Sequence, residues 1–178
     1  MTTTQQRDLR GLRALVTGAT SGLGRAIAFQ LARDGAHVIV HGRDAARGAQ
    51  TVEEIQSRGG SARYVGTDLG DAASIAGFAK EVGDIDILVN NAGLSVWGPT
   101  ETFALASFDG MFAANVRAPF VLVAAFAPGM LARGTGSIIN ISSMAGRLGL
   151  TGGAAYGATK AALASFTQSW AAEYSPRG

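Results

Sequence analysis

The chain has 178 residues, of which 47% are hydrophobic and 16% are charged, and its formal net charge is only +2. This length and apolar content predict a single domain over residues 1–178 and exclude a disordered polymer. The weak charge gives no indication of nucleic acid or membrane partners, and the absence of cysteine excludes disulfides, thiolate metal sites and thiol catalysis.

Short apolar segments alternate with helical ones along the chain. The predicted strands are β-branched and apolar, which is typical of parallel strands covered on both faces, and they are residues 13–17, 37–41, 63–66, 85–90 and 137–142. The predicted helices are residues 22–33, 45–57, 72–82, 103–131 and 154–175. Right-handed crossovers then predict an α/β fold with a doubly wound, Rossmann-like parallel sheet of strand order 3-2-1-4-5. Pro119 predicts a kink or a break in the fourth helix.

A glycine-rich turn joins the first predicted strand to the first predicted helix. Gly18 permits a tight turn, and Gly22 and Gly24 remove side chains where the helix N-terminus would approach a pyrophosphate. An ordinary glycine-rich turn is the alternative. The position between strand and helix, followed by a second strand about 20 residues on, favours a dinucleotide site.

A second candidate site follows the fifth predicted strand. Tyr156 and Lys160 are four residues apart on one helical face, and Ser143 lies at the end of the strand. A nearby ammonium makes a phenol a better proton donor, and a serine hydroxyl can donate to a carbonyl oxygen. Each residue alone has an ordinary structural explanation, such as a lysine over an aromatic ring. Together, behind a dinucleotide site, they predict proton transfer coupled to hydride transfer.

The spacing T-G-x-x-x-G-x-G in the first turn resembles the fingerprint of the short-chain dehydrogenase/reductase family. Further motifs of that family follow in its order, and they are Asp68-Leu69, Asn90-Asn91-Ala92-Gly93, Asn115-Val116-Arg117, Ser142-Ser143 and Tyr156-x-x-x-Lys160. The resemblance extends from about residue 12 to the C-terminus. It implies an oxidoreductase that transfers a hydride between a nicotinamide dinucleotide and a small carbonyl or secondary alcohol substrate.

The resemblance also implies roles for particular residues. The catalytic set is Ser143, Tyr156, Lys160 and Asn115, in which Asn115 would hold a water that links Lys160 to solvent. Asp68 would contact the adenine, and Lys160 would also reach the ribose. The expected cofactor contacts are Thr17, Gly18, Ser21, Gly22, Leu23, Gly24, Arg43, Asp68, Leu69, Asn91, Ala92, Gly93, Tyr156 and Lys160.

The end of the second predicted strand bears on the choice of nicotinamide. By the family's spacing, an acid that binds the 2′-hydroxyl of NAD would fall at Gly42, which has no side chain. Arg43 follows and could pair with a 2′-phosphate, with Arg47 one turn later. Asp44 could instead be the acid that selects NAD, although its position favours a helix N-cap. We therefore expect NADP(H) to be favoured over NAD(H).

Apolar residues follow the fourth and fifth predicted strands, at residues 94–97 and 148–151. Ligands bind at the carboxyl ends of strands in open α/β sheets, so these loops are expected to surround the substrate. Trp97 is expected to line the substrate pocket beside Ser143 and Tyr156. The alternative for Trp97 is that it only packs the loop.

The chain ends at a predicted helix stop, Pro176-Arg177-Gly178. The resemblance implies two further strands and a helical lid, so we expect a C-terminally incomplete domain with an exposed fifth strand. Two functions stay open. One is an NADP(H)-dependent oxidoreductase, and the other is a non-catalytic dinucleotide-binding or interaction module left by truncation.

The two long predicted helices carry few charges, with Asp109 and Arg117 in residues 103–131 and Lys160 and Glu173 in residues 154–175. Helices that are apolar nearly all round are buried on more than one side. The resemblance implies that they pair with their copies in a homodimer or homotetramer. Further C-terminal elements could cover the same surface instead.

The sequence predicts neither a metal site nor a signal peptide or membrane span. His37 and His41 fall on one predicted strand, roughly 13 Å apart in extended chain, so they are a poor metal pair and no metal site is predicted. Residues 2–6 are polar, unlike a signal peptide, and no apolar run is expected to reach the length of a membrane span. We therefore expect a cytoplasmic protein.

Overall fold

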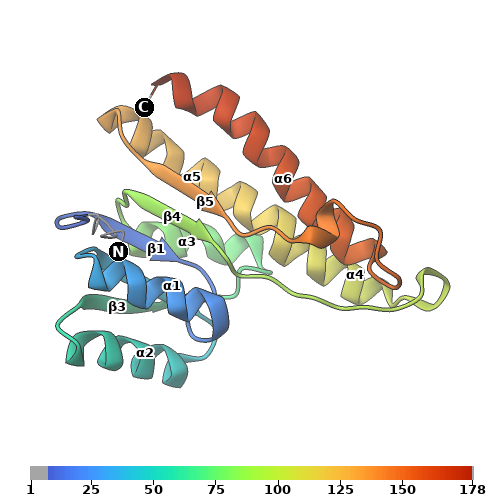
Figure 1. The fold of residues 1–178 in the computed structure, drawn as a ribbon, viewed down its shortest axis with the longest axis horizontal. Coiled ribbons are helices and arrows are strands. Elements are labelled where there is room, and N and C mark those ends of the chain that lie inside the picture. Colours follow the sequence, from blue (N-terminus) through green and yellow to red (C-terminus); the bar gives the residue numbers. More distant parts are fainter. Residues whose placement is uncertain (1–7, 178) are drawn as a thin grey trace, which may run out of the picture.

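The computed structural model describes residues 8–177, so the polar residues 2–6 lie outside the described part of the chain. Strands and helices alternate along it (Figure 1). The strands are β1 (Arg13–Val16), β2 (His37–Gly42), β3 (Ser61–Gly66), β4 (Ile87–Asn90) and β5 (Ser137–Asn140). The α-helices are α1 (Gly22–Arg33), α2 (Ala45–Ser57), α3 (Ala72–Val82), α4 (Leu105–Phe112), α5 (Ala118–Arg133) and α6 (Ala154–Tyr174).

The strands form one parallel sheet in the order β3-β2-β1-β4-β5, which confirms the predicted doubly wound topology. Leu15 of β1 lies in register with Ile39 of β2 on one side and Leu88 of β4 on the other. β5 ends two residues earlier than expected, at Asn140. The chain leaves the sheet there because Ser143 caps a short 3₁₀ turn, Met144–Gly146.

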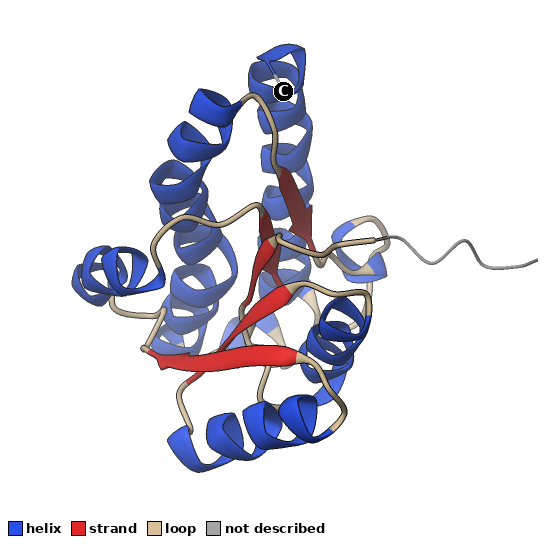
Figure 2. Ribbon diagram, turned by 90° about the vertical axis from the view of Figure 1, so that its left-hand side faces the viewer, coloured by secondary structure: helices blue, strands red, loops and turns tan. Residues whose placement is uncertain are grey.

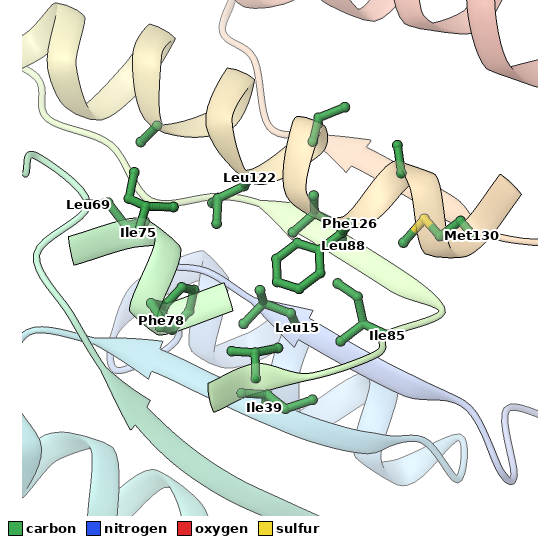
Figure 3. Packing of buried hydrophobic residues seen from close by; sticks show 14 of the residues in the cluster. Leu15, Ile39, Leu69, Ile75, Phe78, Ile85, Leu88, Leu122, Phe126 and Met130 are labelled. Carbon is green, nitrogen blue, oxygen red and sulfur yellow. The ribbon is translucent and has the colours of Figure 1, made fainter. Parts of the chain in front are cut away.

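Helices cover both faces of the twisted sheet (Figure 2). Successive strand residues point to opposite faces, so the strands supply two apolar clusters. The cluster under α3, α5 and α6 contains Leu15, Ile39, Phe78, Leu88, Leu122 and Phe126 (Figure 3). The cluster under α1 and α2 contains Val16, Val38, Val40, Val89, Ala28 and Ile55. Burial on both faces explains why the central strands β1 and β4 show no alternation of apolar and polar residues.

The fourth predicted helix is interrupted, as Pro119 indicated. α4 passes into a π-helical turn, Ala113–Arg117, and α5 begins directly after it with Pro119 in its first turn. Pro119 has no N–H to donate to the carbonyl of Asn115, so a regular α-helical ladder cannot continue there. The irregular turn places Asn115 at the site described below, which is where such turns are often found.

The expectation that no apolar run reaches the length of a membrane span is wrong on length and composition. The helical stretch Leu105–Arg133 has a mean hydropathy of 1.5 over its most apolar part, enough to cross a membrane by these two criteria alone. One such helix is weak evidence for a membrane protein, because a core helix of a soluble protein satisfies the same criteria. Here Leu122, Val123 and Phe126 are buried against the sheet.

Candidate active site

The turn between β1 and α1 has the backbone that its glycines allow. Gly18 and Gly22 have φ values of +64° and +53°, in the left-handed region that glycine adopts without strain. A Cβ at Gly24 would overlap the Asn91 side-chain nitrogen and the Gly18 carbonyl oxygen. α1 starts after Ser21, whose side chain makes no capping hydrogen bond. The first-turn amides of α1 are therefore suited to an anionic ligand.

Thr17 and Asn91 join the end of β1 to the end of β4. The Thr17 hydroxyl donates to the Val89 carbonyl at 3.1 Å and accepts from the backbone N–H groups of Asn91 and Ala92 at 2.9 and 3.0 Å. Asn91 Nδ2 donates to the carbonyls of Thr17 and Gly18 at 2.9 and 3.3 Å. Both side chains thus hold the wall of the site together. Direct contact of either side chain with a cofactor stays a prediction.

A cleft of about 640 Å³ lies at the carboxyl ends of the strands, within the size range of ligand pockets. It straddles β1 and β4, where the chain reverses its direction of progress across the sheet. The predicted cofactor residues that line it are Gly18, Ser21, Gly22, Leu23, Gly24, Arg43, Asp68, Leu69, Asn91, Ala92 and Gly93. The fold thus gathers four separate sequence segments around one cleft.

Arg43 and Asp44 have different surroundings at the end of β2. Asp44 caps α2, because its carboxylate accepts from the Arg47 backbone N–H at 3.0 Å and from Arg47 Nε at 2.8 Å. These hydrogen bonds from Arg47 lower the pKa of Asp44. The predicted N-cap role of Asp44 is confirmed, and the Arg47 side chain is paired with the Asp44 carboxylate. Arg43 is exposed and lines the cleft, with no side-chain hydrogen bond or ion pair within residues 8–177.

His41 is a site residue that the sequence analysis missed, since it considered the histidines only as a metal pair. The side chain is 3% exposed and lines the cleft at the end of β2. Its Nδ1 lies 3.2 Å from the Gly18 backbone nitrogen, and its Nε2 lies 3.2 Å from the Thr67 carbonyl oxygen. The available signal in the sequence was a histidine at the end of an apolar strand, next to Gly42 and Arg43. Its partners are 23 and 26 residues away in the chain, so only the sheet order could identify them.

Lys160 and Tyr156 share one face of α6, and neither of these two predicted cofactor contacts lines the cleft. The Lys160 side chain is buried, and its Nζ lies 5.9 Å from the centre of the Tyr156 ring. That Nζ donates to the Ile141 carbonyl at 2.8 Å and lies 3.7 Å from the position of a Cβ on Gly93, which lines the cleft. Burial lowers the pKa of Lys160. The Lys160 amine is thus held near both the Tyr156 ring and the cleft.

The loop after β5 packs directly on α6, which brings Ser143 to the same region. A Cβ on Gly157 of α6 would lie 2.6 Å from the Ala145 carbonyl oxygen, so only glycine allows this approach. Ser142 Oγ donates to the Lys160 carbonyl at 3.3 Å. Ser143 Oγ accepts from the Ala145 N–H at 3.2 Å, which leaves its own hydroxyl proton available to donate.

Asn115 connects three segments through its side chain. Its Oδ1 accepts from the Leu94 N–H at 2.7 Å, and its Nδ2 donates to the Leu94 carbonyl at 2.8 Å and to Thr159 Oγ1 at 3.0 Å. Thr159, fully buried and adjacent to Lys160, donates in turn to the Tyr156 carbonyl at 2.7 Å. Asn115 and Thr159 therefore fix α6 against the loop after β4. Thr159 was missed in the sequence, and the water-holding role of Asn115 stays a prediction.

Trp97 lies beside the candidate proton donor. Its ring centroid is 5.8 Å from that of Tyr156, and the residue is 47% exposed. The indole N–H donates to Ser95 Oγ at 2.8 Å, and a Cβ on Gly153 would lie 2.7 Å from the indole ring. Trp97 thus packs the loop and also presents apolar surface next to Tyr156. Leu94 and Leu150, on the two neighbouring loops, are exposed as well.

The fold and the cleft define an α/β protein of the Rossmann-like class, and comparison with known proteins narrows the assignment. The sequence profile of the short chain dehydrogenase family matches residues 13–178 of this chain. A gluconate 5-dehydrogenase from Gluconobacter oxydans is 37% identical over 96% of this chain and 68% of its own length.

Two solved structures are more similar still. A short chain dehydrogenase/reductase family protein is 50% identical, with a TM-score of 0.92 over 96% of this chain and 72% of that one. A metagenomic short-chain oxidoreductase in complex with NADP is 42% identical, with a TM-score of 0.92 over 96% of this chain and 79% of that one. The chain belongs to the short-chain dehydrogenase/reductase family of NAD(P)-dependent oxidoreductases, and it spans 68–79% of the length of these three relatives.

Proposed function

We propose that this protein transfers a hydride between NADP(H) and a small carbonyl or secondary alcohol substrate, with Ser143, Tyr156, Lys160 and Asn115 as its catalytic set. The observation that carries the proposal is the position of Lys160. Its buried Nζ faces Gly93 of the dinucleotide cleft on one side and lies 5.9 Å from the Tyr156 ring on the other. One cation therefore serves both the cofactor side and the proton-donor side.

The residues present fit a nicotinamide dinucleotide. Gly24 and Gly18 lie so close together that only glycine fits at position 24, and this turn would form the phosphate cradle. The lining of the cleft includes Arg43 and also Gly93, which lies beside Lys160. The first-turn amides of α1 would hold the pyrophosphate, and Asp68 would contact the adenine. A bound nicotinamide supplies the hydride in reduction and accepts it in oxidation.

The proton chemistry follows from the chain's own residues. In reduction, the Tyr156 hydroxyl gives its proton to the carbonyl oxygen as the carbonyl carbon gains the hydride, and an alcohol is formed. The Lys160 ammonium stabilises the phenolate that remains. The Ser143 hydroxyl donates a hydrogen bond to the same substrate oxygen and orients it. Asn115 and Thr159 keep Tyr156 and Lys160 in place through the hydrogen bonds described above.

Titration and turnover together test this function. NADPH and NADH are titrated separately by nucleotide fluorescence, and nucleotide oxidation is then followed with a panel that contains a keto acid and apolar ketones. The proposal predicts saturable NADPH binding and turnover of at least one panel member. Binding without turnover of any of them would favour the alternative, a non-catalytic dinucleotide-binding module.

The preference for NADP(H) has a test of its own at Arg43. Arg43→Ala is expected to weaken NADPH binding by about tenfold or more and to leave NADH binding nearly unchanged, because only NADPH carries the 2′-phosphate. Arg58→Ala is the matched control, since Arg58 is an exposed arginine at the other end of α2 and does not line the cleft. Dissociation constants for both nucleotides measure the effect. An equal loss for both, or a wild-type preference for NADH, would assign the selection to Asp44.

We also propose that the protein forms a homodimer or homotetramer through α4, α5 and α6. Leu105 and Phe120 are 78% and 50% exposed, and the Phe120 ring lies 5.5 Å from that of Phe166 of α6. An apolar surface of this kind favours association. Sedimentation at micromolar concentration is expected to give a mass above that of one chain, and Phe120→Glu is expected to lower it. A wild-type monomer would contradict the proposal.

A further inference from the structure

The carboxyl ends of β1, β2 and β3 meet at the side chain of His41. Its Nδ1 is 3.2 Å from the Gly18 nitrogen, in the turn after β1, and its Nε2 is 3.2 Å from the carbonyl oxygen of Thr67, directly after β3. The backbone carbonyl of His41 also accepts from the Ala19 N–H at 2.7 Å. One residue of β2 therefore makes two hydrogen bonds to the glycine turn and one to the segment that leads into Asp68.

The partners determine the protonation state of the imidazole. The Gly18 N–H can only donate, so Nδ1 must be the acceptor, and the Thr67 carbonyl can only accept, so Nε2 must carry the proton. A second proton on Nδ1 would face the Gly18 N–H and break that hydrogen bond. The neutral Nε2–H tautomer is thus the form that fits the turn.

The surroundings favour the same form. Burial lowers the pKa of His41 to about 4, against smaller opposing effects of the Thr67 carbonyl and the Asp68 carboxylate. The Phe78 ring of α3 packs edge-on against the imidazole with centroids 5.0 Å apart. Arg43, two residues along the chain, is the nearest basic residue in sequence. The ring is therefore neutral at physiological pH.

The turn that His41 holds is sterically sensitive. Gly18 has a φ of +64°, and its carbonyl oxygen lies so close to where a Cβ on Gly24 would be that the two atoms would overlap. A rotation of the Gly18 peptide would therefore move the first turn of α1. On the other side of the ring, Thr67 precedes Asp68 and Leu69, which line the same cleft.

We propose that His41 is a positioning residue of the dinucleotide cleft. Through neutral Nδ1 it holds the Gly18 turn in the conformation that presents the N-terminus of α1, and through Nε2–H it sets the spacing to the Asp68 segment. This inference rests on the proposed function for its consequence, which is tighter nucleotide binding.

Two substitutions separate the two nitrogens of the ring. His41→Asn places an amide oxygen near the position of Nδ1 and keeps an acceptor for the Gly18 N–H. His41→Gln places an amide nitrogen near the position of Nε2 and keeps a donor for Thr67, but it leaves the Gly18 N–H without its acceptor. The dissociation constant for NADPH is expected to rise about five- to tenfold in His41→Gln and by about twofold or less in His41→Asn. Equal losses in the two variants would overturn the proposal.

Two measurements on the nucleotide-free protein make the test independent of cofactor binding. Nitrogen NMR of the wild-type ring is expected to show the neutral Nε2–H tautomer from pH 8 down to pH 5, and an imidazolium at pH 6.5 would overturn the proposal. Amide exchange at Gly18 is expected to be slow in wild type and His41→Asn and faster in His41→Gln. If wild type binds neither NADPH nor NADH, the proposed function fails. The tautomer and the Gly18 exchange then still decide whether His41 holds the turn.

Discussion

Tyr156→Phe is expected to abolish detectable turnover while leaving the NADPH dissociation constant within a few-fold of wild type. The substitution removes only the hydroxyl, which is the proposed proton donor, and a general acid contributes about 10²–10⁴-fold to a rate. The aromatic ring remains, together with its neighbours Trp97 and Lys160. The affinity for NADPH is therefore expected to remain although turnover is lost.

The measurement pairs NADPH titration with turnover on whichever substrate the wild-type protein accepts. Tyr174→Phe is the matched control, because Tyr174 lies at the opposite end of the same helix, α6. It is expected to retain wild-type turnover. A Tyr156→Phe protein that keeps most of its activity would remove Tyr156 from the acid role.

Gly24→Ala is expected to reduce the affinity for NADPH and NADH together, by about a hundredfold or more. The reason is that overpacking and displacement of the backbone at this position would cost on the order of 3 kcal/mol. The new methyl group would overlap the Asn91 side-chain nitrogen and the Gly18 carbonyl oxygen, so the phosphate cradle must open. Because the pyrophosphate is common to both nucleotides, the loss is expected to be equal, unlike that of Arg43→Ala.

Gly77→Ala is the matched control for Gly24→Ala. Gly77 lies within α3, and a Cβ there would meet nothing within 4 Å. Alanine is favoured over glycine inside a helix, so this variant is expected to gain about 0.5–1 kcal/mol of stability and to bind both nucleotides normally. Urea denaturation and nucleotide titration measure the two effects. Normal nucleotide binding by Gly24→Ala would mean that the cradle is not where the pyrophosphate binds.

The predicted elements were most accurate where local signals are strongest. α1, α2 and α3 have the predicted limits, and the Asp44 and Asp71 side chains accept hydrogen bonds at the starts of α2 and α3. The strand order also followed from the alternation of strands and helices, because crossover handedness leaves few alternatives. Strand ends were less accurate, since the end of β5 depends on how Ser143 turns out of the sheet.

The fourth helix shows a limit of local reasoning. Pro119 indicated an irregularity, but its form, a π-helical turn that continues the helical path, depends on the packing around Asn115. The side chain of Asn115 is buried because Leu94 and Thr159 lie against it, 21 and 44 residues away in the chain. No periodicity in the sequence indicates that residues so far apart in the chain are in contact.

The family, the strand order and most of the residues that line the cleft could be predicted from the sequence, because these depend on glycine spacing, apolar periodicity and motif order. The hydrogen-bond partners of the polar side chains, by contrast, are visible only in the three-dimensional fold. It pairs Thr17 with Asn91 and His41 with Gly18 and Thr67, and it commits Asp44 to a helix cap. The physical reason is that a buried polar side chain must satisfy its hydrogen bonds with whatever backbone the fold brings beside it, and those partners lie on other strands.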